Sequence, residues 1–309
     1  MKKNLIIVES PAKAKTIGNF LGKEYEVIAS KGHIRDLPKS SFGIKIENDE
    51  FIPEYRITSD HSALVKELKS KAKDAKEVYL ATDEDREGEA IAYHIAKAIG
   101  KDENTLPRIV FHEITKSAIG NALKNPRKLN MHSVNAQQTR RLLDRIVGYK
   151  LSPLLGQKIQ RGLSAGRVQS AALKIIVDRE KEIRAFVPLE YFSIDMIFQK
   201  DLNAELVEFD KAKIEKLTLT NKDRAKLVFE ACKNENYAIS NIESKERKIA
   251  PPPPFMTSTL QQSASNRLGF NPKKTMMIAQ KLYEGVNTHE GVMGVITYMR
   301  TDSLNLAKE

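Results

Sequence analysis

Short apolar segments alternate with helical segments through the first third of the chain. Apolar runs at 4–8, 77–82 and 108–112 predict strands, and helical periodicity follows each of them, at 11–21, 88–99 and 116–123. Ser10 and Pro11 are suited to begin the first helix. This alternation predicts a parallel sheet covered by helices, in which ligands bind beyond the carboxyl ends of the strands.

The pattern changes after residue 130. Residues 131–185 are helical and basic, whereas 192–198 and 237–242 alternate as strands and predict a β-rich module. Four consecutive prolines at 251–254 indicate a boundary or hinge. Two helices follow, at about 257–268 and 272–283, with Asn271 capping the second; they form either a helix-turn-helix or a plain packed pair. A final strand, in 294–303, would place Tyr298 and Arg300 on one side.

A dense group of carboxylates follows the strand at 77–82. Asp83 and Glu87 are four residues apart and are predicted to share a helix face, with Asp85 in the turn between them. Glu9 ends the first strand and would face this group across one crevice. A helix dipole would account for one or two acids at a helix start, but not for so many. Because crowded carboxylates repel one another, the segment predicts a site for a hard cation such as Mg²⁺.

The charge of the chain predicts an acidic partner. Its 309 residues carry a net charge of +11, with a pI of about 9.4, and residues 131–190 contribute +6 of this. High charge also serves ordinary solubility, but nucleic acid fits better than a membrane, since we find no long apolar run and no signal peptide. The single cysteine, Cys232, excludes an internal disulfide and indicates a reducing, cytoplasmic setting.

Two glycine-containing segments bear on phosphate binding. Residues 18–24 lack the spacing and the Ser or Thr of an ATP-binding phosphate loop, so no ATP site is predicted. Residues 161–170 join a glycine turn to a helix beside Ser and Arg. This second segment suits either a bound phosphate or a plain connection between helices.

Five segments, in this order, resemble the bacterial topoisomerase I family of type IA DNA topoisomerases. They are 7–17 (IVESPAKAKTI), 31–38 (KGHIRDLP), 83–89 (DEDREGE), 163–170 (LSAGRVQS) and 296–303 (ITYMRTDS). The resemblance implies a multidomain α/β plus α protein. Its parts would be a Toprim domain with a Rossmann-like parallel sheet (1–128), a basic helical groove domain for single-stranded DNA (129–188), a β-rich arch segment (189–250) and a truncated helical nucleophile domain (251–309).

The resemblance also implies roles for individual residues. Tyr298 would attack a backbone phosphate of DNA, assisted by Arg300 and Lys13, while Glu9 would handle the proton of the departing 3′-oxygen. The implied Mg²⁺ ligands are Asp83, Asp85, Glu87 and Glu9, and the implied DNA-binding residues are His33, Arg140, Asp144, Tyr149, Ser164, Arg167 and Gln169. Spacing alone does not single out Tyr298 among nine tyrosines.

The expected protein is an ATP-independent, cytoplasmic, nucleoid-associated monomer that cuts and reseals one strand of single-stranded or negatively supercoiled DNA. Because the chain ends soon after Tyr298, we expect a fragment that does not close the family's ring and so lacks full strand passage. Three alternatives remain: a topoisomerase III that favours decatenation, a noncatalytic single-strand-binding fragment, and a Toprim enzyme that hydrolyses or polymerises.

Overall fold

The computed structural model describes residues 2–199, 202–289 and 291–306. Its internal contacts divide the chain into two compact units. The first comprises Met1–Arg167 and Pro251–Glu309, and the second comprises Val168–Ala250. The predicted domain boundaries at 128, 188 and 250 remain predictions.

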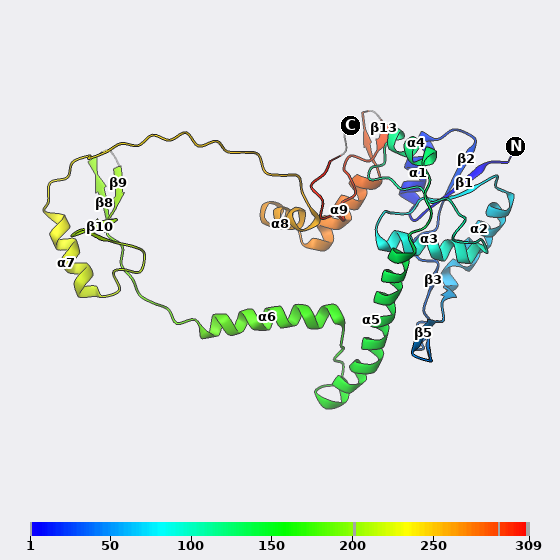
Figure 1. Cartoon of the computed structure of the whole chain (residues 1–309), viewed down its shortest axis with the longest axis horizontal. Coiled ribbons are helices and arrows are strands. Elements are labelled where there is room, and N and C mark those ends of the chain that lie inside the picture. Colours follow the sequence, from blue (N-terminus) through cyan, green and yellow to red (C-terminus); the bar gives the residue numbers. More distant parts are fainter. Residues whose placement is uncertain (1, 200–201, 290, 307–309) are drawn as a thin grey trace. The chain divides into compact units, whose positions relative to one another are not determined.

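A three-stranded parallel sheet forms the centre of the first unit (Figure 1). Strand β1 (Asn4–Val8) lies between β2 (Tyr25–Ala29) and β7 (Val78–Leu80). The predicted parallel sheet is therefore confirmed, although β2 was not anticipated because its residues are mostly half-buried and of mixed polarity.

The predicted strand at 108–112 is wrong. In the described chain, Arg108 makes single bridges to Leu80 and to Arg127, and no strand continues from it. The apolar residues there are buried for another reason, since Ile109 and Phe111 pack in the second core described below.

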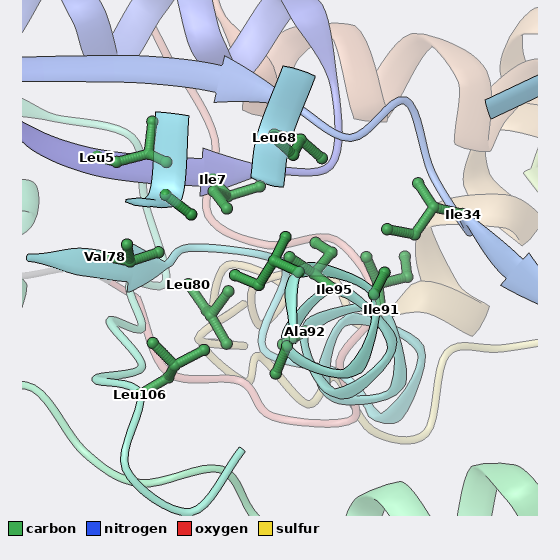
Figure 2. Packing of buried hydrophobic residues seen from close by; sticks show 14 of the residues in the cluster. Leu5, Ile7, Ile34, Leu68, Val78, Leu80, Ile91, Ala92, Ile95 and Leu106 are labelled. Carbon is green, nitrogen blue, oxygen red and sulfur yellow. The ribbon is translucent and has the colours of Figure 1, made fainter. Parts of the chain in front are cut away.

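Helices cover the sheet at the places that the periodicity predicted. Ser10 caps α1 (Pro11–Phe20), Asp85 caps α3 (Arg86–Ile99) and Thr115 caps α4 (Lys116–Lys124). Side chains of β1 and β7 face Ile91, Ala92 and Ile95 of α3 in the first hydrophobic core (Figure 2). The other elements of this part are α2 (Ser62–Asp74), a 3₁₀ turn (Ser59–His61), and two antiparallel pairs, β3 (Arg35–Asp36) with β6 (Arg56–Ile57) and β4 (Ile44–Glu47) with β5 (Glu50–Pro53).

The long helix α5 (Met131–Lys158) begins beside α3 and extends well beyond it (Figure 1). Asn130 caps it by accepting a hydrogen bond from the Ser133 amide at 3.2 Å. Its buried residues, Val134 and Gln137, lie in its first half, whereas Leu151 and Leu154 near its far end are exposed.

The C-terminal part of the first unit packs on the other face of β1. Helices α8 (Thr257–Leu268) and α9 (Pro272–Glu284) form as predicted, and Asn271 caps α9. Ala279, Tyr283 and Tyr298 join Ile6 and Val8 in a second hydrophobic core. Strands β12 (Val286–Thr288) and β13 (Gly291–Met293) form a small hairpin.

The predicted strand in 294–303 is wrong, because the described chain has no strand after Met293. The segment is held by backbone hydrogen bonds instead, from the Val295 amide to the Leu282 carbonyl (2.9 Å) and from the Tyr298 amide to the His112 carbonyl (2.8 Å). Tertiary contacts, not strand pairing, thus fix Tyr298.

The second unit carries most of α6 (Arg167–Ala185) and a small core around Ile194, Leu219 and Val228. Its other elements are β8 (Asp195–Phe198) paired with β9 (Leu202–Glu205), β10 (Glu208–Phe209) paired with β11 (Ala212–Lys213), and α7 (Lys222–Lys233). The strand predicted at 192–198 is present in its second half, whereas the one predicted at 237–242 is wrong: these residues are exposed and pair with no strand. None of the helices in the described ranges is long and apolar enough to cross a membrane.

Candidate active site

Lys13 forms ion pairs with two acidic side chains that follow neighbouring strands. Glu9 follows β1 and Asp83 lies beyond the end of β7, so the parallel sheet delivers both carboxylates to one edge, as predicted. The ammonium group of Lys13, on the first turn of α1, forms ion pairs with both of them. Its side chain is 0% exposed and also lies over the Tyr283 ring, 5.0 Å from the centroid. A cation buried in this way needs acidic partners close by, and Glu9 and Asp83 provide them.

Asp85 connects the acidic segment to the C-terminal part. Its Oδ1 atom caps α3 by accepting from the Gly88 amide at 2.8 Å. Its Oδ2 atom accepts from the Tyr298 hydroxyl at 2.8 Å and from Nη1 of Arg300 at 3.2 Å. Residues that are more than two hundred positions apart in the sequence therefore meet at one carboxylate.

Glu87 lies on the first turn of α3 and points toward α5. Its Oε2 atom accepts from Nε2 of Gln137 at 3.1 Å and lies 3.4 Å from Nε2 of His33. The prediction that Asp83 and Glu87 share a helix face is wrong, because α3 begins only at Arg86 and Asp83 precedes it.

The acidic cavity has a volume of about 340 Å³ and is lined by Glu9, Asp83, Asp85 and Glu87, together with Arg300 and residues of α9. The oxygen-rich lining has the chemistry that Mg²⁺ prefers. However, across the described residues no three His, Cys, Asp or Glu side chains converge on one point. Each carboxylate also contacts Lys13, Tyr298 or Gln137, and metal binding would require the carboxylates to move closer together.

Burial changes the protonation of Glu9. Loss of water around the carboxyl raises its pKa from 4.5 to about 7; Lys13 opposes this rise and Asp83 adds to it. Its Oε2 atom is buried without a hydrogen-bond partner. Near neutral pH this group therefore both donates and accepts protons readily.

Tyr298 is 8% exposed, and its ring packs edge-on against Tyr283 with 5.1 Å between centroids. Burial raises the pKa of its hydroxyl well above the ordinary value of 10, and the negative charges of Asp83 and Asp85 raise it further. The hydroxyl is thus a neutral donor to Asp85. No local sequence feature distinguishes this tyrosine from the others, since its neighbours come from distant segments.

The predicted DNA-binding residues lie in different parts of the structure and do not form one cluster. Asp144 on α5 accepts two hydrogen bonds from Arg167, from Nε at 3.0 Å and Nη2 at 3.3 Å. The Tyr149 hydroxyl lies 2.9 Å from Nη1 of Arg145 and donates to the Lys39 carbonyl at 3.2 Å. Ser164 and Arg140 are exposed, and Gln169 is exposed on the part of α6 that belongs to the second unit.

Arg108 supports the acidic segment and was missed by sequence reasoning. Its guanidinium is fully buried and donates from Nη2 to the Asp83 carbonyl at 2.6 Å, from Nη1 to the Ile109 carbonyl at 2.8 Å and from Nε to Glu89 at 3.2 Å. A buried arginine among carbonyls is not visible in a sequence, because nothing in the segment 107–110 predicts that it points inward.

Arg108→Met is expected to lower the free energy of unfolding of the first unit by about 3 kcal/mol, because Glu89 and several carbonyls lose a buried partner. Chemical denaturation followed by circular dichroism measures the change. Arg127→Met is the matched control: this arginine also pairs with Glu89, but its side chain is 37% exposed, and a smaller loss is expected. Equal losses in the two variants would contradict the buried role of Arg108.

Comparison with known proteins shows to which protein family the sheet, its acidic edge and the tyrosine segment belong. The sequence profile of the Toprim domain matches residues 4–114, which contain the sheet and its acidic edge. Toprim domains bind a divalent metal ion. The profile described as "DNA topoisomerase" matches residues 128–309, which include Tyr298 and Arg300. The chain belongs to the bacterial type IA DNA topoisomerase family.

Individual relatives are consistent with this family assignment. The chain is 97% identical over its whole length to DNA topoisomerase 1 of Campylobacter jejuni, and 61% identical over 307 residues to DNA topoisomerase 1 of Helicobacter pylori. It spans 44% and 42% of the lengths of these relatives. The structure of full-length topoisomerase I from Thermotoga maritima is similar to it, with a TM-score of 0.81 and 49% identity, over 98% of this chain and 50% of that one.

Proposed function

We propose that this chain carries the cleavage and resealing centre of a type IA DNA topoisomerase that acts on one strand without ATP. The observation that supports it most directly is the 2.8 Å hydrogen bond from the Tyr298 hydroxyl to Asp85, because Asp85 lines the acidic cavity together with Glu9 and Arg300. A nucleophile, a proton acceptor and a cation thereby lie within one small space. This is the arrangement that nucleophilic catalysis requires.

In the proposed reaction the Tyr298 oxygen attacks a backbone phosphate of single-stranded DNA. A new bond forms between phosphorus and the tyrosine oxygen, and the bond from phosphorus to the 3′-oxygen breaks. The products are a 5′-phosphotyrosine and a free 3′-hydroxyl. One phosphodiester replaces another, so resealing needs no nucleoside triphosphate.

The neighbouring side chains provide the proton transfers and the charge. Asp85 is the acceptor nearest to the phenolic proton. Glu9, with its pKa raised to about 7, would protonate the departing 3′-oxygen and later remove that proton. Arg300 and Lys13 would stabilise the negative charge of the transition state.

We further propose that Asp83, Asp85 and Glu87, with Glu9, hold Mg²⁺. The ion would assist positioning of the strand and resealing. His33, Arg140, Asp144, Tyr149, Ser164, Arg167 and Gln169 would guide a single-stranded or negatively supercoiled substrate. The proposed enzyme is monomeric and cytoplasmic, in association with the nucleoid.

The double substitution Asp83→Asn with Asp85→Asn tests the metal ligands. It is expected to raise the Mg²⁺ concentration needed for resealing at least about tenfold, because two anionic oxygen ligands become neutral. DNA binding, measured by fluorescence anisotropy without metal, should be retained. An unchanged Mg²⁺ titration would refute the ligand assignment.

A trapping assay tests the proposed function. The chain is mixed with a single-stranded oligonucleotide and Mg²⁺ and then quenched with detergent. A 3′-labelled strand is expected to migrate as a protein–DNA adduct, whereas a 5′-labelled strand should appear only as a shorter free fragment. Cleaved DNA without any adduct would indicate a Toprim nuclease, and bound but uncleaved DNA would indicate a noncatalytic binding fragment.

A further inference from the structure

Helix α2 presents a row of lysines to solvent. Its apolar side packs in the first hydrophobic core, where Leu68 is seen among the residues of the sheet (Figure 2). Lys66, Lys69 and Lys73 are spaced three and four residues apart, so they lie on one side of the helix. All three side chains are exposed. The helix therefore carries a continuous line of positive charge on its surface.

The lysines of this row have no acidic partner. In the part of the chain that the structure describes, none of the three forms an ion pair. Lys71, by contrast, pairs with Glu26 of β2 at 2.6 Å and with Glu67 at 3.4 Å. With 3.6 residues per turn, Lys71 and the row lie on opposite sides of the buried face of α2. The row thus faces away from β2 and from the carboxylates that neutralise Lys71.

Two exposed lysines lie just beyond the end of α2. Lys76 follows the helix, and its amide donates to the Lys3 carbonyl at 2.9 Å. Both side chains are exposed. Together with the row on α2 they form a surface that we call the basic patch. Its members are Lys3, Lys66, Lys69, Lys73 and Lys76.

The surroundings of the basic patch leave a clear excess of positive charge. Residues 62–77 with Lys2 and Lys3 contain seven lysines against three acidic residues, a net charge of +4. Of these acids, Glu67 pairs with Lys71, and Glu77 accepts a hydrogen bond from the Tyr79 hydroxyl at 2.6 Å. An anionic partner is therefore favoured at this surface.

The basic patch lies apart from the acidic cavity. Lys3 precedes β1 and Lys76 precedes β7, so these lysines are at the amino edge of the parallel sheet. Glu9 and Asp83 lie at its carboxyl edge. The five residues of β1 separate the two edges by about 17 Å, at about 3.3 Å per residue. No residue of α2 lines the acidic cavity.

The chemistry of the basic patch suits the backbone of a duplex. Sites for single strands combine a basic groove with aromatic side chains on which bases stack. Helix α2 contains no aromatic residue and presents a convex surface instead of a groove. Lysines are flexible point charges, which suit contacts to phosphates that carry no sequence information. In double-stranded DNA the bases are stacked inside and the phosphates are outside, so such contacts are sufficient.

We propose that the basic patch binds the phosphate backbone of double-stranded DNA, independently of sequence. This goes beyond the proposed function, which concerns a single strand at the opposite edge of the sheet. Because the two edges face apart, the chain would hold a duplex on the basic patch while a single strand occupies the acidic cavity.

The salt dependence of duplex binding tests the proposal. The triple variant Lys66→Gln, Lys69→Gln and Lys73→Gln is compared with the unchanged chain by anisotropy of a short fluorescein-labelled, blunt-ended duplex. Each lost phosphate contact lowers the slope of log affinity against log salt by about 0.9, so a decrease of about 2.7 is expected. Duplex affinity at low salt should fall at least about tenfold. An unchanged slope, or no duplex binding by the unchanged chain at low salt, overturns the proposal.

A second triple variant removes the same charge elsewhere in the first unit. Lys45→Gln, Lys71→Gln and Lys97→Gln replace exposed or half-exposed lysines that already pair with Glu54, Glu26 and Glu103. The slope is expected to change by less than about 1, because these lysines are neutralised by their partners. Circular dichroism verifies that both variants are folded. Equal losses in the two variants would mean that net charge alone matters, which refutes the basic patch.

The same variants distinguish this proposal from the proposed function. The variant of the basic patch should retain the covalent adduct with a 3′-labelled single strand, because the acidic cavity is intact. If the unchanged chain forms no adduct, the proposed function fails, whereas duplex binding is still measured on its own. Binding to vesicles of equal parts phosphatidylserine and phosphatidylcholine that is lost in this variant, with duplex binding unchanged, would assign the basic patch to a lipid surface and overturn the proposal.

Discussion

Tyr298→Phe is expected to abolish the covalent protein–DNA adduct completely. Phenylalanine has no oxygen to bond to phosphorus, and no neighbouring hydroxyl replaces it at Asp85 in the described chain. The ring should still pack against Tyr283, and Arg300 still donates to Asp85, so the expected loss of folding stability is only about 1 kcal/mol. Detergent-quenched trapping with a 3′-labelled strand measures the adduct, and thermal denaturation verifies the fold.

Tyr283→Phe provides the matched control for this result. Tyr283 is more deeply buried, at 0% exposed against 8%, and lies against Tyr298, but its hydroxyl donates to the Phe111 carbonyl, at 3.3 Å, and not to Asp85. The adduct should form in this variant. If Tyr298→Phe still yields the adduct, or if both variants lose it while folded, Tyr298 is not the nucleophile.

Gly88→Ala is expected to destroy the acidic edge. A Cβ atom at this position would lie 1.9 Å from the Asp83 carbonyl oxygen and 2.7 Å from its carbon. Both are backbone atoms, and Arg108 also donates a hydrogen bond to the oxygen, so they cannot give way without moving Asp83. We expect a loss of at least about 3 kcal/mol in folding stability. We also expect at least a hundredfold fall in the cleavage rate, since small displacements of catalytic groups are this costly.

Gly120→Ala is the control for Gly88→Ala. Gly120 also lies within a helix, α4, but a Cβ there meets no atom within 4 Å. This variant should gain about 0.5–1 kcal/mol from its higher helix propensity and keep its cleavage rate. Denaturation curves and single-turnover cleavage compare the two. Similar behaviour of both variants would contradict the close approach of Asp83 to Gly88.

Local chemistry made several features predictable. Ser10 and Asn271 begin their helices as expected, because a cap depends only on residues within the next turn. Glu9 and Asp83 meet as predicted, since parallel neighbouring strands bring their carboxyl ends to one edge. The predictions of strands at 108–112, 237–242 and 294–303 were wrong. An apolar or alternating pattern indicates burial or spacing, but it does not show that a partner strand is available for pairing.

The sequence by itself determined most of the helices (though not α2 or α7), the presence of a parallel sheet, the acidic edge and the family, all of which depend on short segments whose residue types act locally. Tertiary structure alone decided which tyrosine meets Asp85, that Lys13 is enclosed by Glu9 and Asp83, and that Arg108 points inward. These outcomes depend on packing between segments far apart in the chain, and no periodicity or spacing encodes such contacts.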